Sequence, residues 1–246
     1  MAVRSTQEVL LISSRGASHV RSTQEVLLIS VPYTPLAISY PITAPAVSGL
    51  GPQDFTMREV NVVGETESPF TLNQQEQQWQ GQRWEIEINL PPMLYVQAEI
   101  WLAFLGQLFG KFGMFLMGDY LRPTPQGPMN GSPVSVGSNP AAQNSINLTG
   151  ATASVSNWAV AGDYIQLQVS GYPQRIYKVI ENASSDGSGN VTGLAIFPNL
   201  RESVPGGTAI VTSNCKGTFR LMQNTIDWKV DKHKVYTISF KAKEAI

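Results

Sequence analysis

Few residues in this sequence have the side chains needed for acid–base chemistry. Glu85 and Glu87 are the closest carboxylates that share one face of a predicted strand. A catalytic acid needs a raised pKa, which comes from burial or from a neighbouring charge. The alternation of apolar and polar residues around this pair places both side chains on the solvent side. We therefore expect no catalytic residues and predict a protein that is not an enzyme.

The sequence also lacks a recognisable metal or cofactor site. Cys215 is the one cysteine, which excludes a disulfide framework and a cysteine-based zinc site. His19 and His233 are the two histidines, and neither has a second ligand at a suitable spacing. Lys216 lies beside Cys215 and would lower the thiol pKa slightly, but the flanking loop shows no base. We predict no cofactor and no metal.

Five tryptophans are the candidates for stacking against sugars. Trp79, Trp84, Trp101 and Trp228 lie inside predicted strands or a helix, where core packing explains them. Trp158 lies near predicted loops, in the segment SVSNWAVAGD. It is therefore the candidate contact for a glycan.

The composition favours a β-rich structural protein. Of 246 residues only 14% are charged, with 17 basic and 18 acidic side chains, against about 25% in average proteins. A near-neutral chain lacks the basic surface that nucleic acid requires, so we expect no nucleic-acid partner. The longest apolar stretch, residues 93–109, is shorter than the roughly 20 residues that span a bilayer. We expect no membrane partner.

The N-terminal segment, residues 1–48, contains an exact internal repeat. Residues 3–13 and 20–30 both read VRSTQEVLLIS, and residues 31–52 contain five prolines. The apolar run in each copy has no polar face, as in strands that are covered on both sides. We predict an extended arm in which each copy adds to a strand edge or fills a groove on a neighbouring subunit. The predicted partner-binding residues are Thr6, Gln7, Val9, Leu10, Leu11, Ile12, Thr23, Gln24, Val26, Leu27, Leu28 and Ile29.

Two other interpretations of the repeat remain open. The copies would pair with each other as a hairpin on their own domain, or they would record a tandem duplication without function. Tethering two equal segments makes the second binding event intramolecular, which suits a partner with repeated sites.

From Gly49 the pattern predicts a folded core of a sheet and one helix. Residues 84–90 alternate apolar and polar side chains, which predicts a half-buried strand. Residues 93–109 carry apolar side chains at spacings of three and four, which predicts an amphipathic helix that ends at Gly110. Residues 223–246 form one more predicted hairpin that rejoins this sheet.

Strands are also predicted at 55–63 and 70–75. The segment 74–84, QQEQQWQGQRW, is dense in glutamine. Such a tract is sometimes prone to aggregation, but this one is short and contains two tryptophans. We predict a polar strand-and-turn face here.

The middle of the chain predicts a second, inserted domain. After Arg122 the sequence becomes rich in Pro, Gly, Ser and Asn, and short strands then follow at close spacing. These strands are predicted at 145–149, 164–170, 175–180, 191–197, 209–212 and 218–222. The predicted fold class is mainly β (α+β), with an antiparallel sheet and one main amphipathic helix. The predicted domains are the arm at 1–48, a core at 49–122 and 223–246, and a small β-barrel or sandwich at 123–222.

The core sequence resembles the distal-tail and tail-tip proteins of tailed bacteriophages. The arm repeat also resembles short strand-like repeats that begin many virion proteins of these phages. The resemblance in the core covers a Trp-containing strand, a Pro-Pro pair, an aromatic helix and a following K-x-G-x-F strand. These residues are Trp84, Pro91, Pro92, Trp101, Ala103, Phe104, Leu105, Leu108, Gly110, Lys111, Gly113 and Phe115. The segments at 162–168, 177–181, 195–201 and 217–222 resemble the β-barrel inserted in such proteins.

This resemblance implies a non-enzymatic structural component of a phage tail or head–tail junction. The expected partners are other virion proteins, namely adaptor, nozzle, tail-tube or fibre subunits, together with further copies of this chain. The expected location is the virion tail, after synthesis in the host cytoplasm. A long arm departs from a simple distal-tail ring protein and suggests an anchor between virion components, supporting or forming a tail fibre or tip. The alternatives are a carbohydrate-binding module that grips a host glycan and a polysaccharide depolymerase, for which the sequence offers no convergent carboxylates.

Overall fold

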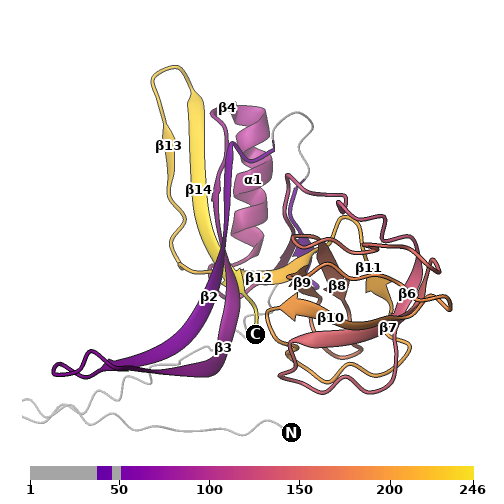
Figure 1. Cartoon of the computed structure of the whole chain (residues 1–246). Coiled ribbons are helices and arrows are strands. Elements are labelled where there is room, and N and C mark those ends of the chain that lie inside the picture. The colour runs from indigo at the N-terminus through magenta and orange to yellow at the C-terminus, as the bar shows by residue number, and fades with distance from the viewer. Residues whose placement is uncertain (1–37, 46–50) are drawn as a thin grey trace, which may run out of the picture. The chain divides into compact units, whose positions relative to one another are not determined.

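The computed structural model of the chain describes residues 38–45 and 51–246. These residues form two mainly antiparallel sheets and one α-helix, so the predicted fold class is confirmed for this part of the chain (Figure 1). Almost all of the predicted arm lies outside the described residues, and its strands stay predictions.

The first sheet is built around one long hairpin. Its strands follow the order β1-β5-β12-β14-β3-β2, with β13 and β4 also paired to β14. β1 and β5 are parallel, and the other pairs are antiparallel. The bounds are β1 Ile42–Thr43, β2 Asp54–Glu67, β3 Gln74–Asn89, β4 Met93–Leu94, β5 Phe115–Met117, β12 Gly217–Leu221, β13 Trp228–Val230 and β14 Val235–Glu244.

The helix α1, Tyr95–Gln107, covers this sheet with an aromatic core. Trp84, Ile86 and Ile88 alternate inward from β3, as predicted, and are almost fully buried. Trp101 from the helix packs against Phe240 of β14, with ring centroids 6.2 Å apart. The sequence thus predicts correctly which face of β3 enters the core.

The helix is two residues shorter at each end than the predicted range 93–109. Met93 and Leu94 form β4, because β14 lies alongside and offers them strand partners. At the other end Gly110 adopts φ +66°, a conformation that glycine accepts without strain. The helix therefore ends at Gln107, three residues before the predicted stop at Gly110.

The second sheet closes almost completely into a barrel. Its strands follow the order β11-β8-β9-β10-β7-β6, and an antiparallel bridge between Val134 and Ala209 joins the two ends. Its core contains Trp158, Tyr177 and Leu194, all almost fully buried. The bounds are β6 Gly131–Ser135, β7 Ser145–Ala151, β8 Tyr164–Leu167, β9 Arg175–Val179, β10 Val191–Phe197 and β11 Ile210–Val211.

One strand that we predicted for the barrel belongs to the first sheet. β12 pairs with β5 and β14, and its Phe219 and Leu221 enter the core of the first sheet. The boundary of the predicted barrel at residue 222 is therefore wrong, because the barrel strands end at β11. Alternation shows which face of a strand is buried, but it does not show which of two sheets the strand joins.

Buried charges connect the barrel to the first sheet. Glu244, the last residue of β14, lies 2.8 Å from Arg201 Nη2 and 3.8 Å from Arg175 Nη1. Arg175 is also 3.5 Å from Glu202, whose pKa is raised by burial against the lowering effect of Arg175. The Trp84 indole N–H donates to the Ile176 carbonyl of β9 at 3.1 Å. These contacts hold β9 and the Arg201–Glu202 segment of the barrel against the ends of β3 and β14.

Replacing Glu244 by Gln leaves two buried arginines facing one carboxylate. Removing one partner of a buried ion pair costs about 3–5 kcal/mol, so we expect Glu244→Gln to lose that much free energy of unfolding in urea. Tryptophan fluorescence measures the transition. The matched control is Glu87→Gln, which removes a carboxylate from partly exposed ion pairs with Arg58 and Lys241 and should change stability little. Similar losses in the two variants would contradict the role of the buried charges.

Candidate functional site

The two carboxylates singled out in the sequence are held in ion pairs on the outer face of β3. Glu87 lies 2.7 Å from Arg58 and 3.1 Å from Lys241, and Glu85 lies 2.6 Å from Arg83. The hydrogen bond from Arg58, helped by Lys241, lowers the pKa of Glu87. A carboxyl with a lowered pKa is a poor proton donor at neutral pH. Glu87 therefore links strands β2, β3 and β14, whereas the ion pair of Glu85 with Arg83 lies within β3.

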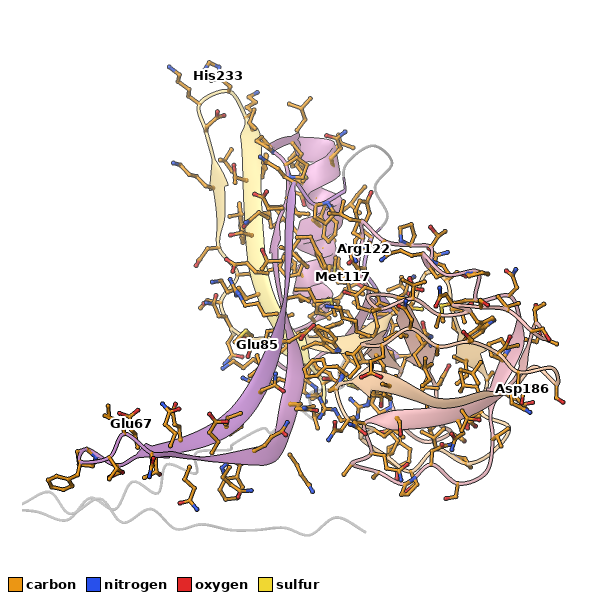
Figure 2. The ribbon with its side chains drawn as sticks, viewed as in Figure 1. Glu67, Glu85, Met117, Arg122, Asp186 and His233 are labelled. Atoms are coloured by element: carbon orange, nitrogen blue, oxygen red, sulfur yellow. The ribbon has the colours of Figure 1, made fainter. Side chains whose placement is uncertain are left out.

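The other reactive side chains are separated in space or buried. His233 lies exposed in the turn between β13 and β14 (Figure 2), and His19 falls outside the described residues. Cys215 is buried, with its sulfur 3.3 Å from the carbonyls of both Tyr164 and Val211. Burial raises the pKa of this thiol to about 12, opposite to the lowering that Lys216 suggested. Within residues 38–45 and 51–246, no three His, Cys, Asp or Glu side chains gather to hold a metal.

Trp84 and Trp101 are buried as predicted, but the other three tryptophans are placed opposite to the sequence prediction. Trp158 is fully buried in the barrel, where its indole N–H donates to the Asn130 carbonyl at 2.9 Å. The predicted glycan contact at Trp158 is therefore wrong, since no face of its ring is open to a sugar. Trp79 and Trp228, predicted to be in the core, are 59% and 53% exposed.

A hollow of about 460 Å³ lies beside α1 and β5. The buried Trp101 indole borders it, and its N–H has no hydrogen-bond partner among the described residues. Pro45 and Gly51, which flank residues 46–50, also line the hollow. We assign it no ligand.

The most unusual surface is the outer half of the β2–β3 hairpin, residues 61–81, which we call the ribbon. β14 pairs with β3 only from Glu85 to Asn89, so no other strand of residues 38–45 and 51–246 lies beside the ribbon. It extends away from the sheet (Figure 1), and Glu67 lies at its far end (Figure 2). Both of its faces are exposed, and Ser68 is its one partly covered residue.

The ribbon exposes large apolar side chains. Phe70 is 94% exposed and Leu72 is 70% exposed, at or beside the turn. Val62, Val63 and Trp79 are each about half exposed on its strands. A two-stranded hairpin is marginally stable in water by itself, and exposed apolar side chains in such a segment are typical of an interaction surface.

The ribbon also carries acidic side chains and no basic ones. It contains Glu65, Glu67 and Glu76, and the sequence has no lysine or arginine between Arg58 and Arg83. Glu65 stands directly opposite Glu76 across the two strands, a pairing of like charges that is unfavourable in an isolated hairpin. A partner with basic side chains would relieve this repulsion.

The sequence analysis missed the ribbon as a functional segment. Its glutamine-rich strand was predicted to be a polar strand-and-turn face, which is correct for its solvent exposure. The signals that mark it as a contact surface are the absence of basic residues over 59–82 and the apolar side chains on both faces of the alternation.

Apolar side chains are exposed on the first sheet and its helix as well. The outer side of α1 and the residue before it expose Leu94, Tyr95, Val96 and Ile100, and β13 exposes Trp228 and Val230. No helix in the described residues is long and apolar enough to cross a membrane.

The predicted partner-binding residues of the arm lie in the undescribed N-terminal segment. They are Thr6, Gln7, Val9, Leu10, Leu11, Ile12, Thr23, Gln24, Val26, Leu27, Leu28 and Ile29. Their role stays a prediction.

Comparisons with known proteins add no family. No protein-family model matches the chain, and a search of the curated proteins finds no match. The functional conclusion therefore depends on the surfaces of this chain.

The burial of Cys215 predicts a thiol that reacts slowly. A pKa of about 12 leaves very little thiolate at pH 8. We expect modification by a disulfide reagent to be at least about 100-fold slower in the native protein than in urea, and to accelerate as the pH rises. Because Cys215 is the one cysteine in the sequence, absorbance of the released thiolate reports it directly. Equal native and unfolded rates at pH 8 would show that the side chain is accessible.

Proposed function

We propose that this chain is a non-enzymatic structural subunit of a bacteriophage tail or head–tail junction that assembles with copies of itself. The ribbon is the observation that carries the proposal. It presents apolar side chains and unpaired strand edges to solvent, which is the form of a segment that pairs with another subunit. The ribbon makes self-assembly the central part of the proposed role.

The phage assignment rests on the sequence resemblance. The mainly-β fold with one aromatic helix and a separate small barrel agrees with the architecture that the resemblance implies. In the proposed assembly the ribbon joins copies of this chain to one another, and the arm joins the assembly to other virion proteins. The two segments therefore have separable effects.

Shortening the ribbon tests the self-assembly. Asn61 and Gln82 stand opposite each other in the hairpin, so residues 62–81 can be replaced by the two-residue turn Asn-Gly. We expect the full chain to form oligomers and the shortened variant to be monomeric by light scattering. Circular dichroism should show that the remaining fold is retained. A monomeric full chain, or unchanged oligomers of the shortened variant, would refute the proposal.

Deleting residues 1–31 tests the arm separately. This truncation should leave the oligomers of the chain intact and abolish binding to purified tails, measured by co-sedimentation. The control is the single substitution Leu10→Asp, which spares the second copy of the repeat and should retain part of the binding. Full binding by the truncated chain would contradict an anchoring role.

A further inference from the structure

The ribbon needs a partner surface that is basic, apolar and open at a strand edge. The β13 strand and the turn after it, residues 227–234, meet these three conditions, and we call them the lysine hairpin. Trp228 is 53% exposed and Val230 is 44% exposed. β13 pairs with β14 alone, so its outer edge has no strand beside it among the described residues.

The charges of the lysine hairpin complement those of the ribbon. Lys229, Lys232 and Lys234 are exposed, and none of them forms an ion pair within the described residues. The Asp231 carboxylate accepts the backbone N–H groups of His233 at 2.8 Å and Val235 at 2.9 Å, so it is turned into the turn itself. The exposed Asp227 and Asp231 offset two of the three lysines, so residues 227–234 carry a net charge of +1 with His233 neutral, against −3 on the ribbon.

The two surfaces lie at opposite ends of one sheet. In the pairing of β14 with β3, Ser239 stands opposite Asn89 and Lys243 opposite Glu85. The turn of the lysine hairpin lies beyond Asn89, whereas the ribbon begins beyond Glu85. Figure 2 shows the separation, with His233 at one end and Glu67 at the other. The ribbon therefore cannot reach the lysine hairpin of its own molecule.

We propose that the ribbon of one copy docks on the lysine hairpin of the next copy. The ribbon carboxylates pair with the hairpin lysines, and Trp79 packs near Trp228. Different surfaces of the two copies meet: two copies that exchange ribbons about a two-fold axis close as a dimer, whereas head-to-tail copies leave a free ribbon or a free hairpin until a ring closes. This inference rests on the proposed self-assembly and names the surface that receives the ribbon.

Charge reversal tests the contact in the full chain. The first variant is Glu65→Lys with Glu67→Lys, the second is Lys229→Glu with Lys232→Glu, and the third combines all four changes. Like charges then face each other in the first two variants and opposite charges in the third. We expect the concentration for half-assembly to rise about tenfold or more in each double variant. In the combined variant it should return to near the unmodified value. Light scattering at low salt measures it.

The matched control is Glu181→Lys with Lys111→Glu, which reverses two exposed charges outside both surfaces and should leave assembly unchanged. Thermal unfolding of each variant verifies the fold. A photo-crosslinker in place of Trp79 provides the second measurement and should attach to residues 227–236 of another copy.

The outcomes separate this inference from the proposed function. Suppose that shortening the ribbon abolishes assembly. If the charge variants then assemble normally, or if the crosslink falls on α1, on the barrel or on another protein, the proposed docking surface is wrong and the assembly role stands. If the combined variant fails to recover assembly while it remains folded, the charge pairing is wrong. If the unmodified chain is monomeric, both are wrong.

Discussion

The contacts at the end of strand β14 attach the barrel to the first sheet. Glu244 accepts the backbone N–H of Trp84 at 3.2 Å and pairs with two arginines from the barrel. A carboxylate buried to 4% exposure is unfavourable without such partners. The barrel supplies them, so burial of Glu244 depends on the attachment of the barrel to the sheet. The contact thus stabilises the position in which the barrel attaches.

The same strand end explains why the ribbon leaves the sheet. β3 continues from Glu85 back to Gln74, but β14 stops at Glu244 and gives this part of β3 no neighbour. Trp84 is the last tryptophan of β3 to enter the core, whereas Trp79 on the same strand faces solvent. The β2–β3 hairpin thus has an inner half that lies in a core and an outer half, the ribbon, that does not. The described residues outside this hairpin place no strand beside the ribbon.

Sequence reasoning predicted the strands and the helix of this fold better than it predicted which elements pack against one another. The alternation of Trp84, Ile86 and Ile88 correctly identified the buried face of β3, and the spacing around Trp101 correctly identified the helix. The same reasoning failed for Trp79, Trp158 and Trp228. Local pattern reports whether a residue lies on a strand, but burial depends on whether another strand or helix covers that strand. Trp79 is exposed because β14 ends at Glu244 and does not extend along this part of β3. Trp158 is buried because its side chain enters the core of the barrel. A window of nearby residues in the sequence shows neither of these tertiary arrangements.

Docking the ribbon on the lysine hairpin follows from this arrangement more directly than a ribbon-on-ribbon contact would. A dimer built ribbon on ribbon would bring Glu65, Glu67 and Glu76 of one copy towards the same glutamates of the other. It would also place the lysines of both hairpins outside the contact, where they neutralise nothing. Docking the ribbon on the lysine hairpin instead pairs each charged surface with its opposite and covers Trp79 and Trp228 together. The barrel joins the sheet between these two ends, at Trp84 and Glu244, and both ends are exposed in the single molecule. A chain with an acidic end and a basic end on one rigid sheet has a direction, and repeated addition in that direction produces a ring or a filament in which every subunit has the same neighbours.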